Sequence, residues 1–228
     1  IILYYKIKDT DTKDLLWACN QLKFPKGKRT AGLVSQSTIF GYEPRKTLRK
    51  DYCSSTAMAR KQKKPHYIIT QFGKTLSDIY KKEIPNVYEN HMKITENKIK
   101  KEWKITDTPF TSGIVNKNNW LAYHFDSGNF KSVYSNMIVL KGNGVQGGYL
   151  ACPEYDIALE CADNTLVMFD GQNILHGVTE INYPLKSSYR YSLVYYSLQQ
   201  MWNCDTIDEE LLRIREVKKL RELKRLNK

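Results

Sequence analysis

Six strand-like segments follow one another in the second half of the chain: GIVNKNNWLAYHF (113–125), YSNMIVL (134–140), GGYLACP (147–153), IALEC (157–161), TLVMFDG (165–171) and YRYSLVYYSL (189–198). Gly, Asn, Asp or Pro bounds each segment, and no helical pattern separates them. Strands that succeed one another without crossover helices pair in the antiparallel sense. The stretch therefore predicts an antiparallel sandwich or jelly roll.

The sequence before this stretch has a helical character. Residues 10–22 form a short amphipathic pattern, and residues 71–104 form a longer one that Pro85 interrupts. Between them, residues 25–64 are rich in Gly, Pro, Lys and Ser, which predicts an ordered loop with short strands around 33–40. We expect these helices to cover one sheet of the β-rich half, which gives an α+β fold.

A third helix is predicted at 206–226, where apolar residues recur every three positions. At 3.6 residues per turn this spacing drifts around the helix, so a continuous coiled-coil seam is not expected. Its first turns should pack on the body and its basic end should project. The chain thus divides into a single domain, 1–205, with a helical part (1–110) and a jelly-roll core (111–205), and a basic C-terminal helix, 206–228.

The composition excludes two classes of protein. Hydrophobic residues make up 41% of the 228 residues and aromatic residues 12%, which is too apolar for a disordered chain. No run approaches the roughly 18 apolar residues of a membrane helix, and no signal peptide opens the sequence. We therefore expect a protein without a membrane partner.

The positive charge is concentrated in two segments. The formal net charge is +12, and residues 23–64 contain 12 basic side chains against two acidic ones. Residues 213–228 contain eight basic side chains against two acidic ones, so the rest of the chain is mildly acidic. Such segments are either solvated faces or contacts to a polyanion such as nucleic acid.

Five cysteines stand at wide spacing, at positions 19, 53, 152, 161 and 204. No Cys-x-x-Cys occurs, so neither a zinc knuckle nor a disulfide framework is indicated. The pattern predicts a reduced, intracellular protein.

Two of the four histidines lie in the β-rich half. His124 and Asp126 are two residues apart, so a strand would turn both side chains to one side. His176 follows the segment TLVMFDG. Two imidazoles and one carboxylate are the facial triad of Fe(II) oxygenases, a ligand set that leaves metal positions open for substrates.

The last strand-like segment adds a candidate carboxylate clamp. Arg190 and Ser192 share one face of it, and a guanidinium fork beside a hydroxyl binds carboxylates well. A metal triad followed by such a clamp is the arrangement that a 2-oxoglutarate oxygenase needs.

These motifs resemble a known family. The matching elements are His124-x-Asp126-x-x-Asn129, the strand ending in Phe169-Asp170-Gly171, His176, the hairpin GGYLACPEY (147–155) and the strand RYSLVYY (190–196). Together they are similar to the ten-eleven translocation (TET)/J-binding protein (JBP) family, whose members oxidise the 5-methyl group of DNA pyrimidines. The resemblance covers roughly residues 110–200.

The resemblance implies a double-stranded β-helix (jelly-roll) core and a cofactor set of Fe(II), 2-oxoglutarate and O2, with ascorbate as a stimulant. It implies iron ligation by His124, Asp126 and His176. Arg190, helped by Ser192, would hold the distal carboxylate of 2-oxoglutarate.

The resemblance also implies contacts to the substrate base, at Asn129 and Tyr196. Two positions depart from the family pattern. Asn119 stands where family members often have an Arg that binds 2-oxoglutarate, and an amide can donate to the same carboxylate without carrying charge. Leu198 stands where family members have a base-reading His, which leaves the identity of the base open.

The implied partner is double-stranded DNA with one base flipped out of the stack, because a methyl carbon inside the duplex is out of reach of an enzyme site. The predicted backbone contacts are Lys28, Arg29, Arg45, Lys61, Lys63 and Lys64. We expect a monomer, in the host cytoplasm if a phage encodes it and in the nucleus if the source is eukaryotic.

The leading hypothesis is a dioxygenase that converts 5-methylcytosine to 5-hydroxymethylcytosine, with further oxidation as an open question. Thymine is the competing base, and a prolyl- or lysyl-type protein hydroxylase would share the triad. A dealkylating nucleic-acid oxygenase would carry a second Arg six residues after the first, where this chain has Tyr196. A non-enzymatic nucleic-acid-binding jelly roll would carry the triad by coincidence.

Overall fold

The computed structural model describes residues 3–25, 36–46 and 50–226. Seven strands form the larger sheet, in the spatial order β1 (Leu3–Lys6), β10 (Thr165–Phe169), β6 (Ser135–Gly142), β13 (Tyr189–Tyr196), β4 (Ser112–Lys117), β2 (Gln36–Glu43) and β3 (Ser54–Ser55). Four strands form the smaller sheet, in the order β5 (Leu121–His124), β11 (His176–Val178), β8 (Leu150–Cys152) and β9 (Ile157–Leu159). A separate pair joins β12 (Ile181–Asn182) to β7 (Gln146–Gly147). Every pairing is antiparallel, as predicted.

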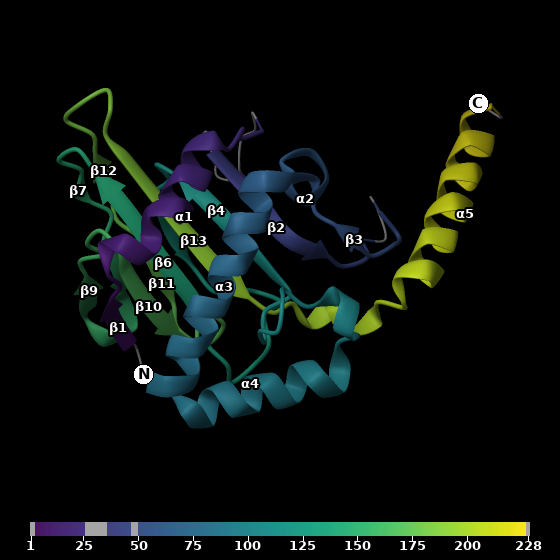
Figure 1. Cartoon of the computed structure of the whole chain (residues 1–228), viewed down its shortest axis with the longest axis horizontal. Coiled ribbons are helices and arrows are strands. Elements are labelled where there is room, and N and C mark those ends of the chain that lie inside the picture. Colours follow the sequence, from purple (N-terminus) through teal and green to yellow (C-terminus); the bar gives the residue numbers. More distant parts are fainter. Residues whose placement is uncertain (1–2, 26–35, 47–49, 227–228) are drawn as a thin grey trace.

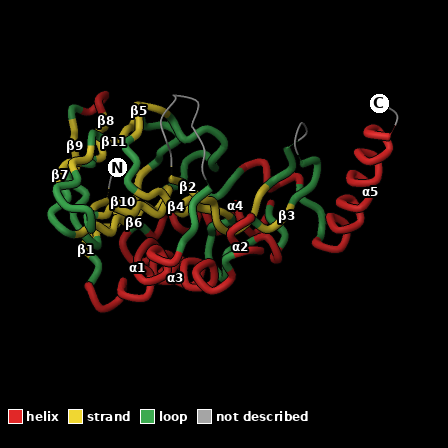
Figure 2. The backbone as a smooth tube through the Cα atoms, turned by 90° about the horizontal axis from the view of Figure 1, so that it is seen from above, coloured by secondary structure: helices red, strands yellow, loops and turns green. Residues whose placement is uncertain are grey.

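The helices lie outside the two sheets. They are α1 (Asp9–Gln21), α2 (Ala57–Lys61), α3 (Lys63–Glu83), α4 (Pro85–Lys98) and α5 (Ile207–Leu226), with short 3-10 turns η1 (Lys101–Trp103), η2 (Pro153–Tyr155) and η3 (Gln199–Asn203). Helices α1 and α3 cover one face of the larger sheet, and the smaller sheet lies on the opposite face (Figures 1 and 2). No helix in the described ranges is long and apolar enough to cross a membrane.

The two faces of the larger sheet follow the alternation of its strands. On β6, Ile138 and Leu140 belong to the buried cluster that contains residues of α1 and α3. Their neighbours Met137 and Val139 belong to a second cluster with residues of β8. Because successive side chains point to opposite faces, one strand serves both layers.

The N-terminal part contains more regular structure than the sequence predicts. Helix α3 begins at Lys63, eight residues before the predicted start, and α2 also lies in the predicted loop. Pro65 stands in the first turn of α3, where the missing N–H costs no helical hydrogen bond, so it marks a helix start rather than a break. The break at Pro85 is confirmed, and β2 extends the strand expected around 33–40, of which residues 33–35 lie outside the described ranges.

The prediction of reduced cysteines is wrong for one pair. Cys53 and Cys204 form a disulfide although 151 positions separate them. Spacing rules test only local pairs, whereas this pair joins the residue before β3 to the segment before α5. The described structure contains three free cysteines, all buried: Cys19, Cys152 and Cys161.

Helix α5 projects from the body, as predicted, and only its first turns are anchored (Figures 1 and 2). Glu210 is 1% exposed, and its carboxylate accepts hydrogen bonds from the Arg45 guanidinium and from the backbone N–H groups of Cys53 and Asp205. Arg45 also pairs with Asp205. The last three turns carry exposed leucines, which include Leu220 and Leu223.

Replacing Glu210 with Ala should destabilise the protein by about 3 kcal/mol, because Arg45 and two backbone donors would lose their buried acceptor. Urea unfolding of the oxidised protein measures the change. Glu216→Ala, on the exposed side of the same helix, is the matched control and should leave the midpoint within experimental error. Equal midpoints for the two variants would contradict the anchoring role.

Candidate active site

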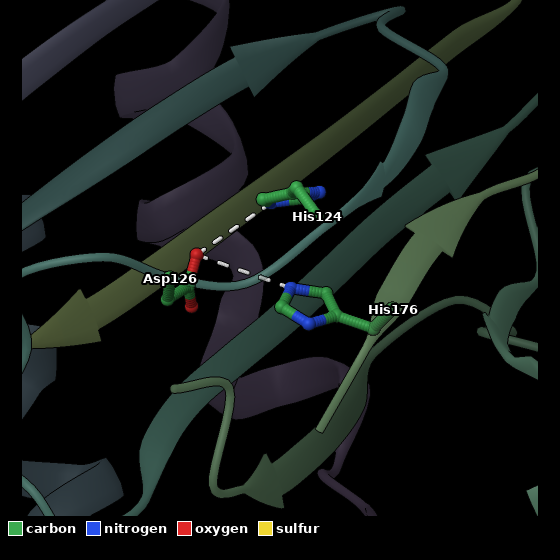
Figure 3. A group of neighbouring side chains, drawn as sticks. All are labelled: His124, Asp126 and His176. Atoms are coloured by element: carbon green, nitrogen blue, oxygen red, sulfur yellow. Dashed lines mark ion pairs between the residues drawn. The ribbon is translucent and has the colours of Figure 1, made fainter. Parts of the chain in front are cut away.

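The three predicted iron ligands come together on the smaller sheet. His124 ends β5, His176 begins β11, and these two residues face each other in the antiparallel register. Their ring centroids are 4.4 Å apart, and Asp126 follows β5 by two residues. One ligand atom from each residue lies within 4.8 Å of the other two, and the side chains converge on one point (Figure 3).

The orientation of both imidazoles suits metal binding. His176 Nδ1 lies 2.8 Å from the Ile174 carbonyl, and His124 Nδ1 lies 3.0 Å from the Ala122 carbonyl. Since a carbonyl only accepts, each Nδ1 carries the proton and each Nε2 keeps its lone pair in the neutral ring. The two Nε2 atoms lie 3.9 and 3.6 Å from the same Asp126 oxygen.

Burial supports the neutral form of His176. This side chain is 5% exposed, and its burial lowers the pKa of the imidazole below the ordinary value. The Phe169 ring packs edge-on against the His176 imidazole, with the two ring centroids 4.8 Å apart. His176 is therefore neutral, which is the protonation state that binds a metal ion.

Gly171 is a site residue that the sequence prediction did not single out. Its carbonyl accepts the Asp126 backbone N–H at 2.8 Å. A Cβ at this position would lie 2.4 Å from Asp126 Oδ2, 3.1 Å from its Cγ and 3.4 Å from His176 Cε1. The quoted segment Phe169-Asp170-Gly171 contained the signal, but a sequence cannot show which side chain a glycine makes room for.

Gly171→Ala should therefore rotate the Asp126 carboxylate away from the two imidazoles. We expect the affinity for ferrous iron to fall by about 10- to 100-fold, comparable to the loss of a group that orients a metal ligand. Anaerobic iron titration measures the loss, and circular dichroism with thermal unfolding shows whether the fold is retained. A folded variant with unchanged iron affinity would contradict the proposed position of the carboxylate.

The triad opens into a cavity of about 350 Å³ between the two sheets. Ser192, Val194 and Tyr196 line it from β13, which confirms that alternate residues of this strand share one face. Apolar side chains such as Leu150 and Met137 form much of the remaining wall. A cavity with apolar walls and polar groups from several strands can fix the orientation of what it binds.

Arg190 lies on the same face of β13, two residues before Ser192, but is not among the cavity-lining residues. It is 1% exposed; Nη2 donates to the Gly148 carbonyl at 3.0 Å, and Nε has no partner in the described structure. Burial lowers the pKa of Arg190, yet a guanidinium remains protonated in proteins. A buried cation with an unused donor, two residues from the cavity-lining Ser192, fits an anionic ligand bound beside Ser192.

The predicted base contacts have different surroundings. Asn129 is 8% exposed, lines the cavity and donates through Nδ2 to Ser135 Oγ at 3.2 Å. Tyr196 and Leu198 also line the cavity. All three side chains therefore lie where a bound base could contact them.

Asn119, the predicted helper for 2-oxoglutarate, is elsewhere. Its Nδ2 donates to Ser37 Oγ at 2.8 Å, and its Oδ1 accepts the Gln36 backbone N–H at 3.2 Å. It is not among the residues that line the cavity. The sequence also gave no reason to single out Asn116, which lines the cavity and accepts from Ser37 Oγ at 2.7 Å.

The predicted DNA-backbone contacts do not form one patch in the described structure. Lys61, Lys63 and Lys64 are exposed at the junction of α2 and α3, in the helical layer, whereas the triad lies on the smaller sheet (Figure 2). Arg45 is engaged by Glu210 and Asp205. The last two predicted contacts, Lys28 and Arg29, lie outside the described residues.

The two facing sheets, the His-x-Asp…His triad and the buried arginine define an Fe(II)- and 2-oxoglutarate-dependent oxygenase. A sequence profile of the family Tet_JBP, described as the oxygenase domain of the 2OGFeDO superfamily, matches residues 37–199, and the chain belongs to this family.

The chain is 33% identical over 121 residues to the bifunctional helicase and thymine dioxygenase JBP2 of Trypanosoma brucei brucei (strain 927/4 GUTat10.1). It is 25% identical over 190 residues to the thymine dioxygenase JBP1 of Trypanosoma brucei brucei. These matches cover 53% and 82% of this chain but only 11% and 22% of the two relatives. Among solved structures, NgTET1 in complex with 5mC DNA superimposes with a TM-score of 0.65 at 14% identity, over 94% of this chain and 80% of the other. This likeness confirms the predicted jelly-roll fold.

Proposed function

We propose that this chain oxidises the 5-methyl group of a pyrimidine base in DNA. The observation that carries the proposal is the His124–Asp126–His176 triad opening into a cavity of about 350 Å³ between the two sheets, in a chain of the Tet_JBP family. The first product would be a 5-hydroxymethyl base. 5-Methylcytosine is the first substrate to test, and thymine is the second, because both JBP relatives are named thymine dioxygenases.

The residues of the site fit the cofactors that the superfamily implies. His124, Asp126 and His176 would hold Fe(II), and Arg190 with Ser192 would hold the distal carboxylate of 2-oxoglutarate. Iron with 2-oxoglutarate and O2 supplies the oxidising power that removes a methyl hydrogen and delivers a hydroxyl group. The unpartnered Nε of buried Arg190 supports the place of the carboxylate.

The other side chains would position the base. Asn129 is held by Ser135, and an amide can read either pyrimidine because it both donates and accepts. Tyr196 would contact the face or edge of the ring. The apolar walls of the cavity would keep water from the reacting methyl group. Flipping the base out of the duplex costs a few kcal/mol, which contacts to phosphates would have to offset.

Product analysis tests the proposal. The protein is incubated with ferrous iron, 2-oxoglutarate, ascorbate and one of two duplexes, with 5-methylcytosine or with thymine as the only 5-methylpyrimidine. Nucleoside mass spectrometry then measures hydroxymethyl, formyl and carboxyl products. We expect product from one duplex in clear excess over the other, and none from His124→Ala.

Two results would overturn the proposal. One is the absence of any oxidised pyrimidine from a preparation that binds iron and 2-oxoglutarate. The other is equal product from the wild type and His124→Ala, which would assign the oxidation to free iron. Hydroxylation of a prolyl or lysyl peptide in place of DNA would support the protein-hydroxylase alternative.

A further inference from the structure

A second cavity, of about 340 Å³, lies between α5 and the β2–β3 end of the larger sheet. It shares no lining residue with the cavity at the triad. Its volume is within the range of about 300–1,000 Å³ that small-molecule sites occupy. Nothing in the oxygenase reaction uses this cavity.

The walls of the second cavity are fixed. The Cys53–Cys204 disulfide joins the β3 side of the cavity to the α5 side. The Glu210 carboxylate accepts a hydrogen bond from the Cys53 backbone N–H on the opposite side. One turn further along α5, Arg213 donates to the backbone carbonyl of Asp51 at 2.6 Å and to its carboxylate at 2.7 Å. A gap between elements that are tied by a covalent bond and two charged contacts is preorganised for a ligand.

Three cations from separate elements converge on this cavity. Arg60 comes from α2, Lys218 from α5 and Lys50 from the residues before β3. Lys50 lies 3.5 Å from the Glu43 carboxylate, and Arg60 donates to a backbone carbonyl and keeps its other donors. Among the described lining residues, Glu210 is the one acidic side chain, and Arg45 and backbone donors already engage it. The lining therefore attracts an anion.

Aromatic side chains form one part of the remaining wall, beside the aliphatic Ile207, Leu211 and Ile214 of α5. Tyr42, Tyr52 and Trp103 line it, and the rings of Tyr42 and Trp103 meet edge to face at 5.3 Å. The Trp103 indole N–H is already used, by the Asp205 carbonyl. Ser54 Oγ, also on the lining, is buried without a partner in the described part of the chain. A ligand with a flat apolar ring and one further hydrogen-bonding group would complement this wall.

We propose that the second cavity binds a nucleotide, with the phosphate at Lys50, Arg60 and Lys218 and the base against the aromatic wall. Aromatic rings beside a positively charged groove are how proteins bind single-stranded nucleic acid without reading sequence. The nucleotide is either a free mononucleotide or part of a DNA strand that passes α5. The inference is independent of the reaction at the triad.

Isothermal titration with dAMP tests this inference, because a purine does not match the pyrimidine proposed for the triad cavity. We expect saturable binding of one dAMP per chain, with deoxyadenosine and inorganic phosphate each binding at least about tenfold more weakly. Lys218→Ala should weaken dAMP binding by about tenfold, since it removes one charged phosphate contact. Lys219→Ala, the neighbouring exposed lysine that does not line the cavity, is the matched control and should bind as the wild type does.

A second variant fills the cavity instead of removing charge. Leu211 lines it and is 48% exposed, so Leu211→Trp should abolish dAMP binding while helix content stays unchanged.

An oligonucleotide that binds at least tenfold more tightly than dAMP and competes with it identifies a strand as the source, and equal affinities identify a free nucleotide. The proposal is overturned by non-saturable binding, by inorganic phosphate binding as tightly as dAMP, or by equal losses in Lys218→Ala and Lys219→Ala.

Discussion

Asp126→Ala is expected to abolish oxidation of DNA and to lower the affinity for ferrous iron by more than about 100-fold. Asp126 is the one carboxylate of the metal cluster in the described structure, and one of its oxygens lies 3.6 and 3.9 Å from the two imidazoles. Loss of an outer-shell partner already costs about 10- to 100-fold in metal affinity, so loss of a ligand costs more. Anaerobic iron titration and product mass spectrometry measure the two effects.

The matched control for this variant is Asp78→Ala, which makes the same chemical change on an exposed position of α3. It should leave iron affinity and product yield unchanged. If Asp126→Ala kept iron and activity, the triad would be a coincidence of the fold, and the non-enzymatic interpretation would replace the proposed one. Thermal unfolding of both variants separates a lost ligand from a lost fold.

The sequence predicted the metal cluster because the cluster depends on local geometry. A spacing of two residues keeps Asp126 close to His124, which ends β5, although Asp126 itself lies beyond the strand. The antiparallel pairing of β5 with β11 brings His176 opposite His124. The shared face of Ser192, Val194 and Tyr196 follows from the alternation of side chains along a strand. Motif spacing and the family resemblance together indicated the ligand set, and strand periodicity indicated which residues of β13 share a face.

Contacts between distant segments were not predictable in this way. The Cys53–Cys204 disulfide and the Arg45–Glu210 pair depend on where α5 lies, which no spacing rule gives. Arg45 therefore looked like a phosphate contact, because a sequence shows its charge but not its carboxylate partners. The contacts of Asn119 were not predictable for a related reason: a resemblance at one position does not show that the side chain turns toward β2.

The second large effect is expected for Arg190→Met, which should weaken the binding of 2-oxoglutarate by about 100-fold or more. Truncating one partner of a buried charge pair costs about 2–5 kcal/mol, and every 1.4 kcal/mol is tenfold in affinity. The substitution should not unfold the protein, because an apolar side chain of similar length removes a buried cation together with its unpartnered Nε donor. Anaerobic titration of the iron-loaded protein with 2-oxoglutarate measures the affinity directly, apart from turnover.

Two further variants make this result specific to the geometry of Arg190. Arg215→Met removes the same charge from the exposed face of α5 and should leave 2-oxoglutarate binding unchanged. Arg190→Lys keeps the charge but loses the planar fork, so its affinity should lie between those of the wild type and Arg190→Met. Arg190→Met and Arg190→Lys, which leave α5 unchanged, should bind DNA equally well, because Arg190 is buried away from any surface that a duplex could contact. An unchanged 2-oxoglutarate affinity in a folded Arg190→Met protein would mean that another cation binds the carboxylate, and the assignment of this end of the cavity would be wrong.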